Sequence, residues 1–219
     1  MKSLDDFSIS PAYQVKYPGV GFGMTLITGS KPVADLQAYA HYKRKLLRKM
    51  RKRETLAQIT QRINIYEGFF HRFGFKCPLP KHLNRTVNSG FPHYNLMVDA
   101  HFMAEMYAGI LVAVTDYDRF DGRLLLDVAR AGEISKGMGQ RDFVTKEGEI
   151  VLRDERDIVC VLCQGADEKT RVKHQTTNVL FYAYAVPGID SVHLKEGLTL
   201  AAEIMAQFGG GRIEGIKIF

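Results

Sequence analysis

The sequence predicts an α+β fold, with helices early and late in the chain around a central block of short strands. Three observations support this fold class. Apolar residues recur at helical spacing in the first third of the chain, short apolar runs dominate residues 123–186, and a helical pattern returns after residue 191. Because strands and helices are segregated rather than alternating, βαβ units are not expected. No repeat or linker interrupts the chain, so we expect one domain over residues 1–219.

The first part of the chain combines a β-rich segment with two helices. Residues 13–29 alternate in character, and a proline and three glycines mark a turn before a strand at residues 24–28. A basic helix is predicted from about residue 32 to residue 53. Thr55 is expected to cap a second helix, which ends at Gly74 and carries an apolar stripe typical of core packing.

The remainder of the chain is predicted to be rich in strands. Residues 75–92 read as a loop with at most one helical turn. A helix covers residues 95–108 and ends at Gly109, because glycine readily adopts the left-handed conformation that closes a helix. A final helix begins near residue 192 and ends in a run of glycines. The predicted strands between these helices are residues 123–129, 147–154, 157–164 and 178–186.

The composition excludes membrane and disulfide-rich classes. The chain has a formal net charge of +6 and is 46% hydrophobic, which is enough for a sizeable core. No stretch approaches the roughly 20 apolar residues of a membrane helix, and the first residues lack the pattern of a signal peptide. We therefore expect a cytoplasmic protein without a membrane partner. Cys77, Cys160 and Cys163 are an odd number, so reduced thiols are expected.

The positive charge is concentrated in the first part of the chain. Residues 1–90 carry 16 basic and 5 acidic side chains, a net charge of +11, whereas the remainder has a net charge of −5. The basic helical part, about residues 32–74, contains a dense run of cations. Its members are Lys43, Arg44, Lys45, Arg48, Lys49, Arg51, Lys52 and Arg53. This density predicts a surface that binds a polyanion, with RNA phosphates as one partner.

Other interpretations of the basic run stay open. Apolar residues at helical spacing, such as Leu46 and Met50, would leave the cations on a solvated helix face without any partner. A nuclear-import signal or a segment that binds an anionic membrane surface has a similar composition. Tyr39 and Tyr42 are the only aromatic residues near the cations, so the run predicts contacts to an RNA backbone rather than base stacking.

Metal and cofactor motifs are not supported by their context. The glycines at residues 19–23 precede a strand, whereas a phosphate-binding loop opens a helix. Cys160 and Cys163 are three residues apart in a predicted strand, so they are expected on opposite faces, and no second pair follows. The acidic segment at residues 116–122 lacks the spacing of a calcium loop and predicts a tight turn. We therefore expect no metal and no cofactor.

An ordered series of phrases carries a resemblance to a known family. The phrases are LMVDAHFMAEMYAG, DYDRFDG, RAGE, GEIVLRDERDIVCVLCQG and TTNVLFYAYAVPG. In order and spacing they resemble the B3/B4 domain of the phenylalanyl-tRNA synthetase beta chain, in the form in which that domain exists as a free-standing protein. The resemblance covers about residues 15–215. It implies a mixed or barrel-like β core flanked by helices, and tRNA or another structured RNA as the partner.

The resemblance also implies a substrate pocket, because in the synthetase this domain hydrolyses tRNA wrongly charged with tyrosine. The chain departs from the family there, with Phe102, Ala113 and Tyr182 in place of Asn, His and Glu. These replacements remove polar groups that would position water or an ammonium group. Asp99 has an alternative role as a buried carboxylate bonded to the backbone or to a neighbouring strand. The pocket candidates are Asp99, His101, Phe102, Ala113, Thr177 and Tyr182, and no catalytic residue is identified.

Two main hypotheses of function follow. In the first, the protein binds tRNA or another structured RNA without catalysis, through the basic helix and a pocket in the β core; DNA is not expected as a partner. In the second, it is a trans-acting aminoacyl-tRNA deacylase. A small-molecule or protein-interaction role is a third class. The sequence leaves the tRNA, the amino acid and the oligomeric state open.

Overall fold

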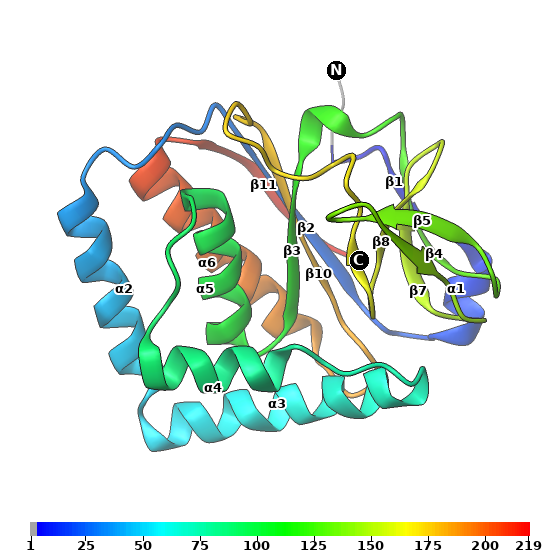
Figure 1. Ribbon diagram of the computed structural model, residues 1–219, viewed down its shortest axis with the longest axis horizontal. Helices are drawn as coiled ribbons and strands as arrows, with labels where there is room; N and C mark the ends of the chain where they lie inside the picture. Colours follow the sequence, from blue (N-terminus) through cyan, green and yellow to red (C-terminus); the bar gives the residue numbers. More distant parts are fainter. Residues whose placement is uncertain (1–3) are drawn as a thin grey trace.

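A computed structural model describes residues 4–219, and its centre is a four-stranded antiparallel sheet (Figure 1). The strand order is β11-β2-β10-β3, so segments from the beginning, middle and end of the chain lie side by side. The strands are β2 (Phe22–Thr28), β3 (Leu111–Asp116), β10 (Val179–Tyr184) and β11 (Arg212–Ile218). Tyr182 of β10 stands between Met24 of β2 and Ala113 of β3. The segments that follow Gly109 and Asn178 are therefore adjacent.

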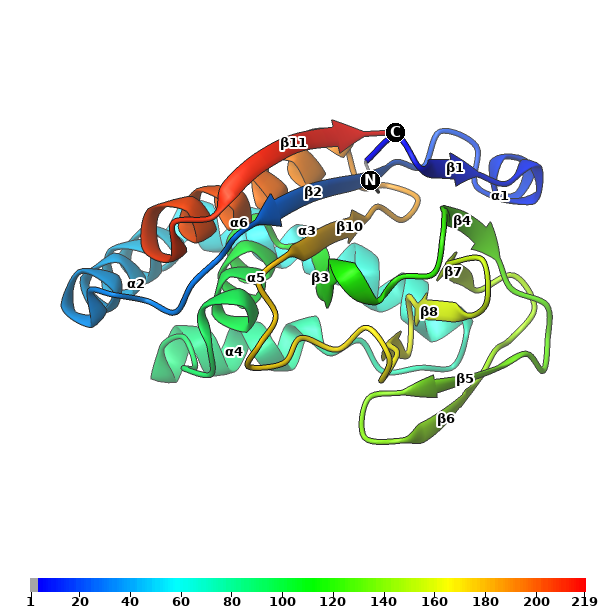
Figure 2. The ribbon, with the colours of Figure 1, turned by 90° about the horizontal axis from the view of Figure 1, so that it is seen from above.

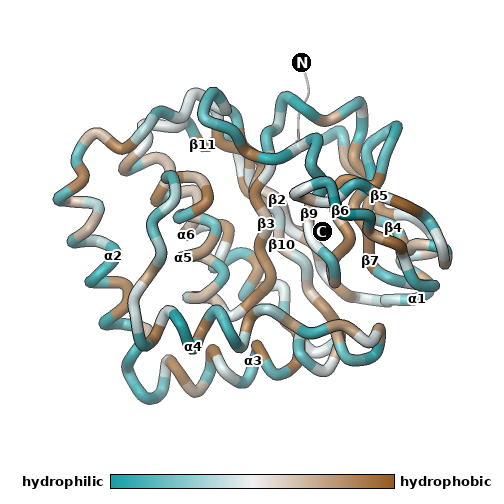
Figure 3. The backbone as a smooth tube through the Cα atoms, viewed as in Figure 1, coloured by the Kyte–Doolittle hydropathy of each residue, from teal (hydrophilic) through white to brown (hydrophobic). Residues whose placement is uncertain are grey.

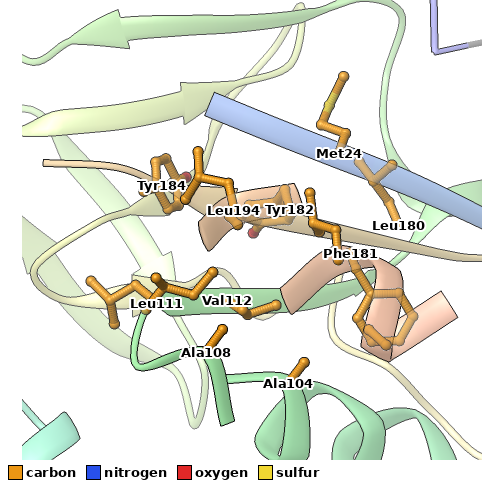
Figure 4. Packing of buried hydrophobic residues seen from close by; sticks show 14 of the residues in the cluster. Met24, Ala104, Ala108, Leu111, Val112, Leu180, Phe181, Tyr182, Tyr184 and Leu194 are labelled. Carbon is orange, nitrogen blue, oxygen red and sulfur yellow. The ribbon is translucent and has the colours of Figure 1, made fainter. Parts of the chain in front are cut away.

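Two helices cover one face of this sheet. α6 (Ser191–Gly209) packs on β2, and α5 (Leu96–Ala108) packs on α6 and β3. Figure 4 shows the small side chains of Ala104 and Ala108 on the side of α5 that faces β3 and β10. An outer layer surrounds this pair (Figures 1 and 2). It consists of α2 (Leu36–Met50), α3 (Arg53–Arg72) and α4 (Leu79–Ser89).

A second sheet, with the order β1-β4-β7-β8-β9, lies at the end of the molecule opposite α2 (Figures 1 and 2). β1 pairs in parallel with β4, and the other pairs are antiparallel. β5 and β6 form a separate hairpin, and two short helices, α1 and η1, complete the described elements. The bounds are α1 Pro11–Lys16, η1 Tyr117–Arg119, β1 Phe7–Ile9, β4 Leu124–Val128, β5 Ile134–Gly137, β6 Arg141–Val144, β7 Ile150–Arg153, β8 Ile158–Val161 and β9 Gly165–Ala166.

The α+β fold class is confirmed, but the barrel-like core is not. Within residues 4–219 both sheets are open, because β1 does not pair with β9 and β3 does not pair with β11. A closed barrel requires every edge strand to find a partner. Here β9 is only two residues long, and β3 borders a pocket instead of another strand.

The main core lies where α5 and α6 meet the four-stranded sheet and where the two sheets approach each other. Figure 3 shows hydrophobic residues along β3 and β10 in the centre, whereas hydrophilic and hydrophobic residues alternate on the outer helices. All six residues of β10 are buried, which accounts for its continuous apolar sequence. Because side chains alternate along a strand, Phe181 and Tyr182 point to opposite faces (Figure 4).

Several predicted helices are confirmed with adjusted bounds. α5 begins after Asn95, whose side chain accepts the N–H of Val98 at 3.0 Å, and it ends at Gly109, where φ is +64°. The predicted basic helix is shorter than expected, since Asp35 caps α2 by accepting the N–H of Ala38 at 2.8 Å. The prediction that Thr55 caps the next helix is wrong, because α3 already begins at Arg53.

Two further predictions about the first half of the chain are wrong, and one central strand was not predicted. The supposed loop at residues 75–92 contains α4, whose start is favoured by the proline in its first turn and whose buried face is set by Leu79 and Leu83. Residues 13–16 belong to α1 and not to a strand, because Ser10 caps a helical turn by accepting the N–H of Tyr13. β3 was not predicted, since its apolar run follows a buried helix without a polar break.

Candidate functional site

The basic run covers the second half of α2 and the start of α3. Tyr39, Leu46 and Met50 are buried and hold α2 against the protein. Six cations of the run are exposed and form no ion pair with any residue in the described part of the chain. They are Arg44, Lys45, Arg48, Lys49, Lys52 and Arg53. Neighbouring like charges repel one another, so this surface favours a bound polyanion.

The other two cations of the run hold helices together. Lys43 Nζ donates to Asp99 Oδ2 at 2.6 Å and to the carbonyl oxygen of Pro92 at 2.7 Å, and its side chain is only 13% exposed. Arg51 Nε donates to the carbonyl oxygen of Val87 in α4 at 2.9 Å. Sequence reasoning could not separate these two residues from the six exposed cations, because their partners lie 36 or more residues away.

Asp99 links α2 to the start of α5 and does not line a pocket described below. Its side chain is fully buried and accepts hydrogen bonds from Lys43 Nζ, from the Tyr39 hydroxyl at 3.1 Å and from the N–H of Tyr94 at 2.8 Å. His93 Nδ1 lies 3.0 Å from the same carboxylate. The carboxylate therefore joins α2 to the start of α5. This agrees with the alternative interpretation of Asp99 as a buried carboxylate bonded to the backbone.

A cavity of about 450 Å³ lies between β3, β8 and the middle of α5, and we call it the inter-sheet pocket. Its volume falls in the range typical of small-ligand sites. His101 and Ala113 are the sequence-predicted candidates that line it. Its other polar or ionisable lining residues are Lys76, Glu105, Cys160, Cys163, Gln164, Arg171 and Tyr184. The remaining lining is mostly apolar, which suits a ligand with an apolar part.

Glu105 and two histidines form a polar cluster beside the inter-sheet pocket. Glu105 is 4% exposed, and its Oε1 accepts a long hydrogen bond of 3.4 Å from the N–H of Val112. His101 Nε2 lies 3.9 Å from Glu105 Oε1, and His82 Nδ1 lies 3.6 Å from Oε2. These separations exceed a hydrogen bond, so the carboxylate keeps free acceptor capacity next to two imidazoles. A movement that brought either imidazole within hydrogen-bond distance of the carboxylate would orient it as a general base.

Tyr182 lies beneath the pocket beside Cys160 and Tyr184. Its side chain is fully buried, and the hydroxyls of both tyrosines interact with the Cys160 thiol. Burial raises the pKa of both phenols far above the ordinary value, and the nearby Cys160 thiol adds to the effect. Burial also raises the pKa of Cys160 to about 11. These groups are neutral hydrogen-bond donors rather than nucleophiles at neutral pH.

The remaining two candidates lie elsewhere. Phe102 packs against His82, with ring centroids 5.1 Å apart, and lines no pocket described here. Thr177 lines a second cavity of about 740 Å³ between three loops, which we call the loop pocket. The loops and the helix starts that adjoin them are residues 30–36, 93–97 and 172–177. The loop pocket and the inter-sheet pocket share Val172 and are therefore neighbours.

The basic run does not border the inter-sheet pocket. α5 separates them, because Asp99 on one side of this helix contacts α2 whereas His101 and Glu105 on another side face the pocket. Figure 1 shows α2 on the outside of the molecule, with α5 between it and β3. The loop pocket lies between these two regions, since Leu36 at the start of α2 belongs to its lining.

One acidic cluster has the spacing of a metal site. Oxygens of Asp121, Asp154 and Asp157 lie within 4.8 Å of one another. The Lys169 ammonium occupies the space between them, at 3.2 Å, 2.6 Å and 3.1 Å respectively. This ammonium supplies the positive charge that a cation would otherwise bring, so the cluster is an internal salt bridge.

Sequence reasoning missed the partners of His101. The spacing of His101 and Glu105 on one helix could have indicated a shared face, because residues four apart are neighbours. His82 could not be found this way, since its segment was predicted as a loop. Cys160 and Cys163 were expected on opposite faces, but both line the inter-sheet pocket because β8 ends at Val161 before Cys163. All three cysteines are free thiols.

No helix in residues 4–219 has the length and apolar character needed to cross a membrane. A comparison with curated protein sequences gives no match. Among solved structures, the fold is similar to an N-terminal fragment of the phenylalanyl-tRNA synthetase beta subunit from Pyrococcus horikoshii, with a TM-score of 0.51 and 11% identity. The match covers 94% of this chain and 49% of that fragment, so the chain spans about half of its length. Residues 69–210 match the B3/4 domain, which confirms the resemblance seen in the sequence: the chain belongs to the B3/4 domain family.

Proposed function

We propose that this protein binds RNA, with tRNA as the expected partner, through the exposed cations of α2 and its junction with α3. The single observation that carries the proposal is the group of six exposed cations without an ion pair among the described residues, which we call the cationic face: Arg44, Lys45, Arg48, Lys49, Lys52 and Arg53. Phosphate groups would compensate this charge and release bound counterions. Similarity to a domain of a tRNA synthetase subunit supports RNA over other polyanions.

A filter-binding titration with tRNA at several salt concentrations tests the proposal. We expect affinity to fall steeply with salt, with a slope of about 0.7–0.9 in log–log units for each phosphate contact. Replacing Arg44, Lys45, Arg48 and Lys49 by Gln should weaken binding and reduce this slope by about 3.

A matched control separates the cationic face from the overall charge. Arg119, Arg123, Arg130 and Arg141 are exposed and lie outside the basic run, so their replacement by Gln removes the same charge. This control should keep most of the RNA affinity. Equal losses in both variants, or no loss in either, would contradict the proposal.

A second function, hydrolysis of an aminoacyl ester, is favoured by the polar cluster at the inter-sheet pocket. His101 would take a proton from a water molecule, and the water oxygen would attack the ester carbonyl. The protonated His101 would then return the proton to the leaving ribose oxygen, giving free amino acid and uncharged tRNA. Glu105 Oε1, which is 3.9 Å from His101 Nε2, would move into hydrogen-bond distance, orient the imidazole and stabilise its protonated form.

Release of labelled amino acids from charged tRNA tests this second function. His101→Asn and Glu105→Gln should lower the rate by at least about 100-fold if the pair provides general base catalysis. His41→Asn is a suitable control, because His41 is exposed on α2 and outside the pocket. A rate equal to spontaneous hydrolysis for every amino acid would reject the activity and leave RNA binding unaffected.

A further inference from the structure

We propose that the loop pocket binds a nucleotide of a single-stranded RNA segment, with its base against Tyr94 and its phosphate at Lys31, Lys173 and His174. This inference rests on the proposed RNA binding and identifies a second contact, which differs in kind from the cationic face. The face offers charge alone, whereas the loop pocket combines charge, a cavity and an exposed aromatic ring.

The loop pocket has an exposed hydrophobic rim. Tyr94 is 62% exposed and Leu36 is 63% exposed, and both line the cavity of about 740 Å³. Contact between large apolar side chains and water is unfavourable, so a ligand that covered these two residues would gain binding free energy. A nucleobase could bind to this surface, because proteins commonly hold single-stranded nucleic acid by stacking its bases on aromatic rings.

The charge of the loop pocket suits a phosphate. Its lining includes Lys31, Lys173, His93 and His174 and no Asp or Glu. Neither lysine forms an ion pair within residues 4–219, and Lys31 is exposed. His93 instead faces the buried Asp99 carboxylate at 3.0 Å, so we assign it to the wall rather than to the phosphate contact.

Backbone donors at the start of α5 border the loop pocket. Ser30 also belongs to the lining, but its hydroxyl is buried beside Gly211, so we do not assign it to the phosphate contact. The N–H groups of Leu96 and Met97 open helix α5, where no preceding turn supplies a carbonyl oxygen. The start of a helix attracts anions because its N–H groups and its dipole both favour negative charge. Leu96 and Met97 line the same cavity as Lys31 and Lys173.

The position of the loop pocket connects the other two regions. Lys43 of the basic run and His93 of the loop pocket both contact Asp99 Oδ2, at 2.6 Å and 3.0 Å. On the opposite side, Val172 belongs to both the loop pocket and the inter-sheet pocket. An RNA whose structured part lies on the cationic face can therefore pass a single-stranded end through the loop pocket toward the inter-sheet pocket.

Fluorescence anisotropy with two labelled RNAs tests the inference. One probe is an intact tRNA, and the other is the same tRNA without the last four nucleotides of its single-stranded 3′ end. The wild-type protein should bind the intact probe more tightly. Tyr94→Ala should weaken the intact probe about 10-fold, the effect of losing one stacked base, and should leave the truncated probe unchanged.

Control variants separate stacking from folding and from general charge. Tyr94→Phe keeps the ring and should retain wild-type affinity, whereas the double variant Lys31→Gln with Lys173→Gln should weaken the intact probe only. The fourfold variant of the cationic face should weaken both probes equally. Circular dichroism checks that Tyr94→Ala is folded, as its exposure predicts.

The outcomes distinguish this inference from the proposed function. If the cationic-face variant loses both probes while Tyr94→Ala binds like wild type, the loop pocket does not hold a nucleotide and RNA binding stands. If wild type binds neither probe, the proposed function fails, and a labelled four-nucleotide RNA at low salt then tests the pocket alone. Failure of Tyr94→Ala to change binding of that short RNA overturns the inference.

Discussion

Lys43 and Asp99 form a buried ion pair, with the Lys43 ammonium 2.6 Å from Asp99 Oδ2. The two residues lie 56 positions apart and join the outer helix α2 to the first turn of α5. The sequence placed Lys43 in an RNA-binding run and Asp99 in a substrate pocket. Their contact shows that both residues hold α2 against α5. It also places the basic helix beside the loop pocket.

Replacing Lys43 by Met should destabilise the protein by about 1.5–3 kcal/mol, because the buried Asp99 carboxylate would lose a charged donor but keep the hydrogen bonds from Tyr39 and Tyr94. Urea unfolding followed by circular dichroism measures the change. Lys45→Met removes the same charge from an exposed position of α2, and its effect should stay within about 0.5 kcal/mol. Similar losses in the two variants would mean that the ion pair contributes nothing specific.

Replacing Lys169 by Met should destabilise the protein at neutral pH and much less at acidic pH. Burial opposes ionisation of Asp154, but hydrogen bonds from Lys169 and from backbone N–H groups outweigh it and lower the pKa of this carboxyl below 3.8. A carboxyl whose pKa is lower in the folded than in the unfolded protein stabilises the fold at pH values above its unfolded pKa. This contribution disappears as the pH falls through the folded pKa.

The expected loss for Lys169→Met is about 1–2 kcal/mol at pH 7, since the lysine is 30% exposed and partly screened by water. Thermal unfolding at pH 7 and in steps below pH 4 measures the difference from wild type. The exposed pair of Lys136 and Asp142 provides the control, because Lys136→Met should change stability little at either pH. A difference for Lys169→Met that does not shrink in acid would contradict the assignment.

Two glycine substitutions should have opposite effects. Gly109 closes α5 with a φ of +64°, and a Cβ there would lie 3.0 Å from the carbonyl oxygen of Ile59. Gly109→Ala should therefore destabilise the protein by more than about 1 kcal/mol. Gly68 is exposed inside α3 with open space around it, so Gly68→Ala should stabilise by about 0.5–1 kcal/mol. Melting temperatures of both variants, compared with wild type, test the pair.

The cysteines should react slowly in the folded protein. Burial raises the pKa of Cys160 to about 11 and that of Cys77 to about 12, and it raises the pKa of Cys163 as well. Thiolates are the reactive form, so iodoacetamide at pH 8 should label these residues mainly after unfolding. Mass spectrometry with and without urea measures the labelling. Rapid labelling of Cys160 in native conditions would contradict the burial of its thiol.

The sequence by itself determined the features that depend on local pattern. The end of α5 at Gly109 follows from the conformational freedom of glycine, and the buried strand β10 follows from its unbroken apolar run. The α+β class followed from the segregation of helices and strands, and the ordered phrases indicated the B3/4 domain family. α4 was missed because its prolines resemble those of a loop. β3 was missed because its apolar run directly follows a buried helix, without a polar break to mark the start of a strand.

Only the tertiary structure decided which functional groups meet. Asp99 was separated from His101 because residues two apart lie on different faces of a helix, so one contacts α2 and the other lines the inter-sheet pocket. The loop pocket is assembled from three loops that are far apart in the chain, and no local pattern encodes their approach. Contacts between distant segments depend on packing and strand order, which the residues of one segment do not specify.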